Sequence, residues 1–356
     1  GYGALENQTS ATSTTVANVA VGYAAGNDIT SGTRNSIVGT FAGDELTTGY
    51  YNTILGYSAL GEDTQGATAV ALGYAALSNQ NFTTATVHYN VAVGYNAGTG
   101  VTTGINNVLI GGLAGDALTD ADRNVAIGTS ALSADSLGSR SVAVGYGTLN
   151  AQNFTTATNT YNTAVGYGAG LAVTTGTKNT LIGGFAGDAL QTGALNTTLG
   201  YNALGLDTEG TRSVAIGSDA LAAQNFTTTT SANNTAVGYF VGNNITTGVS
   251  NTLMGATAGD ALTDADYNVA LGATSLTSDT LGSRSVAVGY AALTMQNHTT
   301  AQNTNNTAVG YAAGTDLTTG IQNTLLGSLA GTDLTDADNN TAIGYGALDG
   351  DTLGSR

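Results

Sequence analysis

The sequence of 356 residues contains no cysteine and only two histidines. Without cysteine, neither a disulfide framework nor a cysteine-based zinc or redox site can form, and the usual ligand sets of transition metals are nearly absent as well. No run of 18 apolar residues occurs, so we expect no segment of the chain to span a membrane. No basic-then-apolar leader opens the chain. Because the sequence starts and stops within a repeat, we expect it to be a piece of a longer protein.

Positive charge is also scarce, with seven Lys and Arg residues against 24 Asp and Glu residues and a net charge of −17. Nucleic acids need clustered cations, so we expect no nucleic-acid partner. Catalytic motifs are equally weak. The glycine loop at 166–171 has neither a following helix pattern nor a partner acid, and His88 and His298 occupy different positions of the repeat. The chain is therefore not expected to be an enzyme.

Glycine is abundant and keeps a fixed register. Twenty anchor glycines, each closing an A-V-G-type triplet, run from Gly1 to Gly344 at steps of 21, 17, 17 and 17 residues that repeat without a slip. A short repeat of 17 residues is thus nested in a long repeat of 72 residues. Disordered chains have no reason to keep phase, whereas a solenoid buries the face of each coil on the next.

We therefore predict an all-β fold, a parallel β-solenoid or β-roll of about twenty coils of 17 or 21 residues. Residues 1–356 are expected to form a single continuous solenoid without domain boundaries. The long repeats are 18–89, 90–161, 162–233, 234–305 and a partial 306–356, preceded at 1–17 by the end of another repeat.

The residues before each anchor glycine predict a short β-strand. A large aliphatic residue directly precedes the anchor and Val, Thr or Ser stands two places earlier, so these two side chains share one face. Between them stands Ala, or a larger residue in the second coil of each long repeat. Because both faces are apolar, we expect the strand to be buried on both sides.

Two further columns have a structural interpretation. Asn recurs four residues before the anchor in fifteen coils, which predicts a ladder of side chains hydrogen-bonded along the solenoid axis. The anchor glycine itself suits a position of positive φ or of close backbone approach.

Charge is confined to one arc of the coil. Of the 24 acids, 23 lie five to eleven residues after an anchor, and the arc from four residues before to four after it is otherwise uncharged. A contiguous apolar stripe of that size rarely stays exposed, so we expect parallel copies to associate laterally into a fibre, first of all as a homotrimer. All seven cations lie five residues before an anchor position, at Arg34, Arg123, Arg140, Lys178, Arg212, Arg284 and Arg356.

The larger residue in the middle of the second strand of each long repeat falls within this uncharged arc. Asp substitutions there are expected to dissociate the oligomer before they unfold the coils. The residues concerned are Leu109, Leu181, Leu253 and Leu325.

The unit NTAVGYAAGTDLTTGIQ at 306–322 resembles the repeats of tail-fibre-like and giant surface proteins of phages and bacteria, which often precede an endosialidase-type chaperone domain. SVAVGY at 285–290 is also similar to the head repeats of trimeric autotransporter adhesins, although those adhesins use shorter coils. The resemblance implies a left-handed parallel β-roll packed as a trimer. It further implies a fibre or adhesin located outside the cell, on its surface or on a virion.

Three acid-rich turns, at 115–124, 259–268 and 331–340, carry the ligand type that calcium prefers. They lack the glycine spacing of an EF-hand loop, and a solvated, solubilising turn is the alternative interpretation. The candidate calcium ligands are Asp116, Asp120, Asp122, Asp260, Asp264, Asp266, Asp333, Asp336 and Asp338. A separate column of acids in the third coils would pair only weakly with the cations at the surface; it consists of Asp63, Asp135, Asp207, Asp279 and Asp351.

Every fourth coil carries an insertion of four residues at the same place. Loops on a regular scaffold often bind ligands, so we expect a Phe or His at each loop tip to contact a glycan or a neighbouring fibre. An indifferent bulge is the alternative, and each loop also holds an N-x-T glycosylation sequon. The candidate binding residues are Asn81, Phe82, Thr83, Asn153, Phe154, Thr155, Asn225, Phe226, Thr227, Asn297, His298 and Thr299.

Three functions remain open at this point. The first is a structural and adhesive fibre that presents repeated loops for multivalent attachment, for example to a cell-surface glycan. The second is a purely structural surface filament or surface-layer protein whose loops contact other fibres. The third is an ice-binding solenoid, which adjacent threonines disfavour because their side chains point to opposite faces of a strand.

Overall fold

The computed structural model describes residues 1–9 and 15–355, so the last cation of the column, Arg356, lies outside the described residues. Within the described residues the chain forms strands and turns but no helix. Nineteen strands of three residues each end directly before an anchor glycine, from Gly22 to Gly344. The chain is therefore an all-β parallel β-solenoid of about 19 turns of roughly 17 residues, which confirms the predicted fold class at this level.

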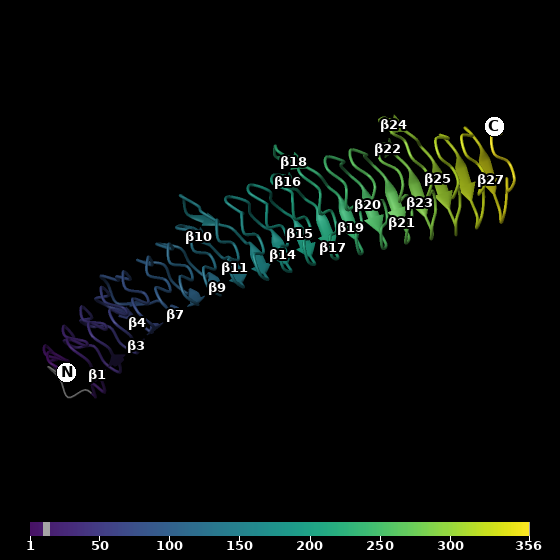
Figure 1. Cartoon of the computed structure of the whole chain (residues 1–356). Coiled ribbons are helices and arrows are strands. Elements are labelled where there is room, and N and C mark those ends of the chain that lie inside the picture. Colours follow the sequence, from purple (N-terminus) through teal and green to yellow (C-terminus); the bar gives the residue numbers. More distant parts are fainter. Residues whose placement is uncertain (10–14, 356) are drawn as a thin grey trace. The chain divides into compact units, whose positions relative to one another are not determined.

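The chain divides into two compact units, and the first comprises Gly1–Lys178. Its nine coil strands pair in parallel and in sequence order, with equivalent residues opposite each other, as Ala71 is opposite Ala92 (Figure 1). These strands are β1 (Val19–Val21), β2 (Ser36–Val38), β3 (Thr53–Leu55), β5 (Val70–Leu72), β7 (Val91–Val93), β8 (Val108–Ile110), β9 (Val125–Ile127), β11 (Val142–Val144) and β13 (Thr163–Val165).

The second unit, Asn179–Arg356, has ten coil strands with the same parallel register. The division falls inside the long repeat at 162–233, and a single continuous solenoid stays a prediction. The strands are β14 (Thr180–Ile182), β15 (Thr197–Leu199), β17 (Val214–Ile216), β19 (Thr235–Val237), β20 (Thr252–Met254), β21 (Val269–Leu271), β23 (Val286–Val288), β25 (Thr307–Val309), β26 (Thr324–Leu326) and β27 (Thr341–Ile343).

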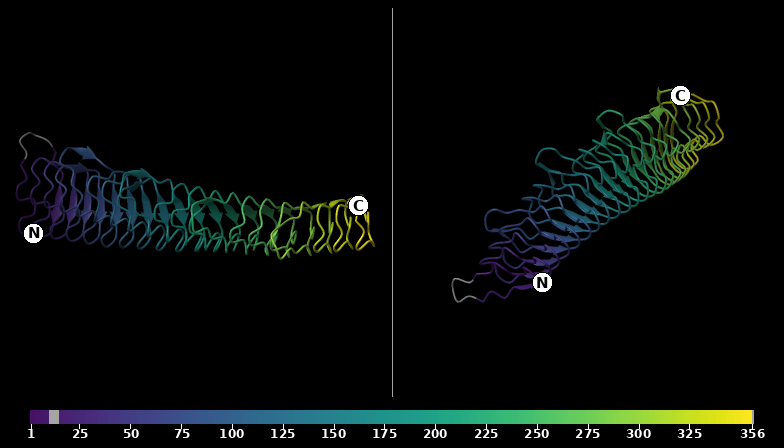
Figure 2. Two further views of the ribbon diagram at one scale, coloured as in Figure 1. Left: turned by 90° about the horizontal axis from the view of Figure 1, so that it is seen from above. Right: turned by 60° about the vertical axis from the view of Figure 1, so that its left-hand side comes forward.

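Each inserted loop is tied to the coil before it by a separate two-stranded parallel sheet. The loops emerge beyond the outline of the regular coils, two in each unit (Figure 2). The four sheets are β4 (Gly66–Ala67) with β6 (Thr86–Val87), β10 (Gly138–Ser139) with β12 (Thr158–Asn159), β16 (Gly210–Thr211) with β18 (Thr230–Ser231), and β22 (Gly282–Ser283) with β24 (Gln302–Asn303).

The anchor glycines need both properties that the sequence suggested. Gly56 has a φ of 143°, and a Cβ on it would lie 2.1 Å from the carbonyl oxygen of Gly73 in the next coil. The same approach recurs along each unit, for example between Gly200 and Gly217 at 2.3 Å. Any side chain here would collide with the backbone of the next coil. The coils can therefore stack only if each anchor position is glycine.

The asparagine ladder is confirmed. The backbone N–H of Asn107 donates to Oδ1 of Asn90, 2.9 Å away, and Nδ2 of Asn107 donates to the carbonyl oxygen of Ala121 at 2.7 Å. These side chains are buried, so each of them satisfies backbone groups that would otherwise lack partners in the interior.

The strands bury one face, not two. In β3 and β20 the middle residue is buried and both flanking residues are exposed. The expectation of strands buried on both sides is therefore wrong for the single chain. The middle residues form the core with the Ala, Leu and Ile side chains of the turns, whereas the flanking residues form an outer sheet surface.

The larger residues of the second coils point inward as well. A Cβ on Gly98 would lie 2.6 Å from Cδ1 of Leu109, and one on Gly115 would lie 2.7 Å from Cδ2 of the same side chain. Leu109 thus fills space that two glycines leave open, and it is fully buried. The placement of Leu109, Leu181, Leu253 and Leu325 on the outer surface is therefore wrong, because all four have an exposure of 1% or less.

Candidate functional site

The aromatic residue of each inserted loop is folded back onto the coil. Phe82, Phe154, Phe226 and His298 are exposed by only 5 to 7% of their surface. A carboxylate of the preceding coil holds the backbone there: Oδ1 of Asp63 accepts from the N–H of Phe82 at 3.1 Å. The expectation that these rings form exposed loop tips is wrong.

The tip of each loop is small and mostly polar, whereas Val87, Tyr89 and Tyr161 are exposed where the first two loops return to the coil. In the first loop Thr83, Thr84 and Ala85 are exposed, and the equivalent residues of the other three loops are exposed too. The sequon asparagines Asn153, Asn225 and Asn297 are exposed and Asn81 is half-buried. Hydroxyls of the preceding coil donate to these amide oxygens, as Oγ1 of Thr208 does to Asn225 at 3.2 Å. Binding by Thr83, Thr155, Thr227 and Thr299 stays a prediction.

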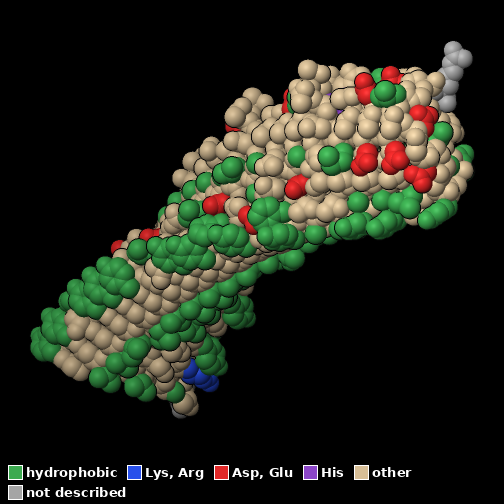
Figure 3. Space-filling model, turned by 45° about the vertical axis from the view of Figure 1, so that its right-hand side comes forward, with side chains coloured by type: hydrophobic (Ala, Val, Ile, Leu, Met, Phe, Trp, Pro, Cys, Tyr) green, Lys and Arg blue, Asp and Glu red, His purple; other side chains and the backbone are tan. Residues whose placement is uncertain are grey.

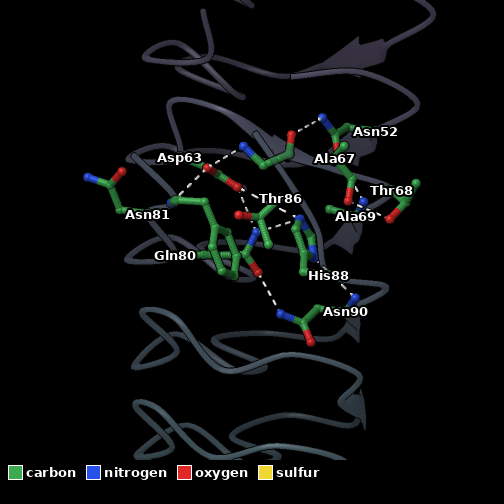
Figure 4. Close-up of polar contacts among 12 residues, drawn as sticks. Asn52, Asp63, Ala67, Thr68, Ala69, Gln80, Asn81, Thr86, His88 and Asn90 are labelled. Carbon is green, nitrogen blue, oxygen red and sulfur yellow. Dashed lines mark hydrogen bonds and ion pairs between the residues drawn. The ribbon is translucent and has the colours of Figure 1, made fainter. Parts of the chain in front are cut away.

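Beneath the first loop lies a buried polar cluster (Figure 4). Nε2 of Gln80 donates to Oδ2 of Asp63 at 2.7 Å and lies 3.0 Å from Nε2 of His88. Oε1 of Gln80 accepts from Nδ2 of Asn90 at 2.8 Å. The ring of His88 stacks on Phe82 with centroids 5.0 Å apart. The loop is therefore fastened to the core by hydrogen bonds and by a stacked ring pair.

The other three loops build the same cluster with different side chains. In the second loop Nε2 of Gln152 donates to Asp135 at 2.6 Å and to Oγ of Ser141 at 2.9 Å, and that hydroxyl lies 2.6 Å from Oγ1 of Thr160. Two hydroxyls thus occupy the place that the first loop fills with one imidazole. Oε1 of Gln152 also accepts from Nδ2 of Asn162, the next asparagine of the ladder, at 2.8 Å. The fourth coil has no ladder asparagine, and Gln152 contacts Asn162 in its place.

Burial sets the ionisation of the cluster. It lowers the pKa of His88 to about 4 and raises the pKa of Asp63, against the opposing effect of the hydrogen bonds from Gln80 and the backbone. The pKa values of Asp135 and Asp207 are raised in the same way. His88 is therefore neutral at neutral pH.

The fourth loop differs because His298 replaces the phenylalanine. Burial alone would raise the pKa of Asp279, but His298 and the hydrogen bond from Gln296 together outweigh burial and lower that pKa. Burial alone would lower the pKa of His298, but Asp279, with the carbonyl of Thr319 and the charge of Asp336, raises it. Nδ1 of His298 is 3.8 Å from Oδ1 of Asp279. This distance suits an ion pair, and it is too long for a hydrogen bond.

The acid column of the third coils is buried in the four loop clusters, so the expected weak surface pairing with the cations is wrong. Asp63, Asp135, Asp207 and Asp279 are all 0% exposed. The fifth member, Asp351, is partly exposed and accepts from the N–H of Gly354 at 2.9 Å. Cations do approach rings instead: NH1 of Arg34 donates to the hydroxyl of Tyr51 at 3.0 Å.

Sequence reasoning missed this cluster, although a signal for it exists. Seven residues after the anchor, the first and second coils carry buried aliphatic residues such as Leu46 and Leu118, the third coil carries Asp and the fourth carries Gln. A column that alternates between aliphatic and polar residues at a core position predicts a buried polar contact.

The acid-rich turns do not gather their carboxylates around one point. Over residues 1–9 and 15–355, no group of three His, Asp or Glu side chains is placed to hold a metal ion. Single carboxylates instead bond to the preceding coil: Oδ1 of Asp122 accepts from the N–H of Ile105 at 2.8 Å. The three-carboxylate calcium site is thus not formed by Asp116, Asp120, Asp122, Asp260, Asp264, Asp266, Asp333, Asp336 or Asp338.

The outer surface of the coil strands forms the uncharged sheet face, which we define as the first and last residue of each strand and the residue after each anchor glycine. No position of this face carries a charged residue. Large apolar side chains on it are exposed, including Leu55 and Met254 at 50% each. Rows of hydrophobic side chains are visible on the surface in Figure 3.

Tyrosines after the anchor glycines stack on one another along this face. The ring centroids of Tyr57 and Tyr74, and those of Tyr74 and Tyr95, are 5.4 Å apart, and Tyr290 and Tyr311 are 5.6 Å apart in the second unit. Their rings remain about half exposed. The face is therefore apolar, regular and open.

No protein-family model matches the chain, and no curated protein is significantly similar to it. The described residues also contain no helix long and apolar enough to cross a membrane. Two surface features suggest interactions with other molecules, namely the uncharged sheet face and the inserted loops.

Proposed function

We propose that the chain is a structural and adhesive segment of an extracellular or virion fibre. Copies associate side by side through the uncharged sheet face, and the inserted loops provide repeated points of attachment. The observation that carries the proposal is the combination of exposed aliphatic residues and stacked tyrosines on a face without charge. A large exposed apolar patch usually marks an interaction surface.

The exposed area is large enough for a stable contact. Six tyrosines of the first unit (Tyr23, Tyr57, Tyr74, Tyr95, Tyr146 and Tyr167) are exposed by 47 to 58%. An aromatic side chain presents about 150–250 Å², so these six offer on the order of 600 Å² before the aliphatic residues are added. A standard protein interface buries roughly 800 Å² per partner.

The occupant that fits this face best is a second copy of the chain. A second copy has the same spacing between coils, so its side chains can stay in register with those of the first over many turns. Neither copy brings a charge into the contact, and so neither loses the hydration of one. A trimer with left-handed coils, as the sequence resemblance implies, belongs to this proposal.

The loops suit weak, repeated attachment. Each unit presents two loops that are four coils apart, and the exposed residues at their tips are mainly threonine, alanine and asparagine. Small polar side chains make weak single contacts, which add up when the target is itself repetitive, as a glycan or a neighbouring fibre is.

A purely structural filament is the second candidate. It is favoured by the burial of Phe82, Phe154, Phe226 and His298, because the loop tips then lack the aromatic anchor that dominates many binding sites. In that case the loops contact only sister fibres. Ice binding ranks below both. It would need a regular row of threonines on the outer surface, but the first residue of the strand is valine in many coils.

The oligomeric state of the chain in solution tests the proposal. Sedimentation velocity should find an oligomer for the natural chain and a monomer for Leu55→Asp, which places a charge in the sheet face. Thr48→Asp adds the same charge seven residues earlier at an exposed position outside that face and should leave the oligomer intact. A well-folded monomer for the natural chain would overturn lateral association.

A further inference from the structure

A groove runs beside the stacked rings of the first unit, on the side away from the strands. It consists of two hollows of about 360 and about 320 Å³, and both are lined by Asp44 and Glu45. The groove therefore passes from coil to coil along the unit, from Tyr2 to Asn79. Its floor is made of glycine, alanine and serine. An open groove of this kind admits a linear oligomer better than a compact ligand.

Aromatic rings form one wall of the groove. Phe41 stands across the row, at 83° to the ring of Tyr23 and at 89° to that of Tyr57. Neither neighbour stacks on the face of Phe41, whereas Tyr57 and Tyr74 stack nearly parallel at 8°. Phe41 is therefore stacked on neither tyrosine, and it lines the hollow next to the shared carboxylates.

Carboxylates form the opposite wall. Glu6, Asp28, Asp44, Glu45 and Glu62 line the two hollows, and no Lys or Arg does. Burial raises the pKa of Asp44, and the charges of Glu45 and Asp28 add to the rise. The charges of Glu45 and Asp28 thus disfavour the charged form of Asp44, and a ligand with positive charge would offset that repulsion.

This wall is not a general product of the repeat. In the next three long repeats the place of Glu45 is taken by Ala117, Ala189 and Ala261, and that of Glu62 by Ala134, Leu206 and Ser278. The coils therefore stack equally well without these acids. The place of Phe41 is taken by Leu113 in the second long repeat and by Phe185 in the third, where the ring lies at 86° to Tyr201. Phe185 has Asp188 in the place of Asp44 but no acid in the places of Glu45 and Glu62.

We propose that this groove binds a linear oligosaccharide of amino sugars, with the apolar face of a sugar ring on Phe41 and the ammonium groups paired with Asp44, Glu45 and Glu62. The aromatic wall suits the C–H face of a pyranose, and the carboxylates accept from its ammonium and hydroxyl groups. A peptide in extended conformation fits less well, because backbone N–H groups of the lining, such as those of Ser58, Glu62 and Ala75, already donate to neighbouring coils. The site is separate from the inserted loops and does not depend on lateral association.

Calorimetry with glucosamine oligomers and the full chain tests the site, at a pH that keeps the amines charged. Glu45→Ala should weaken binding about tenfold through loss of one charge-assisted contact. Phe41→Leu should weaken it several-fold, because leucine lacks the flat ring. Both replacements occur naturally at the equivalent positions, so both variants are expected to fold.

Two matched variants control for the net negative charge of the chain. Phe185→Leu makes the same change at a ring that lacks the acids equivalent to Glu45 and Glu62, and Glu209→Ala removes the same charge outside the groove. Neither change should alter binding. N-acetylated oligomers of equal length should bind about tenfold more weakly, since they lack the charge.

The proposal is overturned if glucosamine oligomers do not bind, if Phe41→Leu binds them as well as the natural chain does, or if the acetylated oligomer binds equally. It is also overturned if oligolysine of the same charge binds as tightly and Phe41→Leu leaves that binding unchanged, because the groove would then act as a mere patch of negative charge. None of these outcomes changes the oligomeric state, so the groove can fail while the fibre proposal stands.

Discussion

A Cβ on Gly98 would lie 2.6 Å from Cδ1 of Leu109, so the leucine of one coil occupies the space that the glycine of the preceding coil leaves empty. The pair explains why a large residue fits the middle of the second strand in each long repeat. It also explains why Leu109 is fully buried while its neighbour Ile110, one residue along the same strand, is 36% exposed. Two adjacent aliphatic residues therefore have opposite roles.

Asp substitutions at these two neighbours should separate stability from association. Leu109→Asp is expected to unfold the surrounding coils, because it buries a charge without a partner, and Leu109→Ala should cost about 2–5 kcal/mol. Ile110→Asp should change the free energy of unfolding little and dissociate the oligomer. Urea unfolding and sedimentation together measure both effects. If Leu109→Asp melted like the natural chain, the inward direction of this side chain would be wrong.

A side chain at an anchor glycine should break the stack. A Cβ on Gly128 would lie 2.3 Å from the carbonyl oxygen of Gly145, and the residue has a φ of 133°. We expect Gly128→Ala to cost several kcal/mol, well above the roughly 1 kcal/mol typical of point mutations. Gly112→Ala is the matched control, since its Cβ would have no neighbour closer than the oxygen of Tyr95 at 4.0 Å. Thermal melting of the two variants should differ clearly, and equal melting would contradict the close approach.

The glycine spacing predicts the coils, because a register of 17 residues repeated without error leaves few folds besides a solenoid. The direction of the side chains was harder to predict. A strand such as Val91–Val93 is apolar on both faces, so alternation alone does not tell which face is inside. The face of the strand that points inward is set by the residue that packs against it in the core, four residues after an anchor. Where that residue is glycine, as at Gly98, it leaves space for a large middle residue of the strand such as Leu109.

The positions of the loop aromatics do not follow from the insertion alone for a related reason. The N–H of Phe154 is bound by Asp135 of the preceding coil, 19 residues away in sequence. The acids of the turns likewise have partners one coil earlier, such as the N–H of Ile105, and these partners leave no cluster of three carboxylates in the described residues. Contacts between coils determine both sites, and a single repeat does not reveal them.

Removal of a loop aromatic should therefore destabilise the protein. Phe154→Ser is expected to cost about 3–5 kcal/mol, the range for truncating a buried phenylalanine. Thr156→Ala in the same loop is exposed and should be nearly neutral. Differential scanning calorimetry of both variants checks this. An unchanged melting temperature for Phe154→Ser would mean that the ring is not part of the core.

His88 fills the space that Ser141 and Thr160 share in the second loop, and Ala69 stands where the serine does. The double variant Ala69→Ser with His88→Thr should therefore rebuild the two-hydroxyl cluster. Each single change is expected to be more destabilising than the pair. Ala69→Ser alone places a hydroxyl against the imidazole of His88, and His88→Thr alone leaves a cavity where the ring was. A double-mutant cycle at neutral pH measures this coupling, and simple additivity would contradict it.

The same double variant should change how stability depends on pH. The pKa of His88 is lowered from 6.5 to about 4 in the folded chain, so the unfolded chain binds a proton that the folded chain does not between these values. Stability from His88 is thus complete above pH 6.5 and is lost as the pH falls towards 4, by about 3 kcal/mol in all. The raised pKa of Asp63 acts in the opposite direction but is present in both proteins, so their difference isolates His88. Urea unfolding from about pH 7 to about pH 4 should show the natural chain losing stability relative to the double variant. Parallel curves would mean that His88 is protonated, or exposed to water, in the folded state.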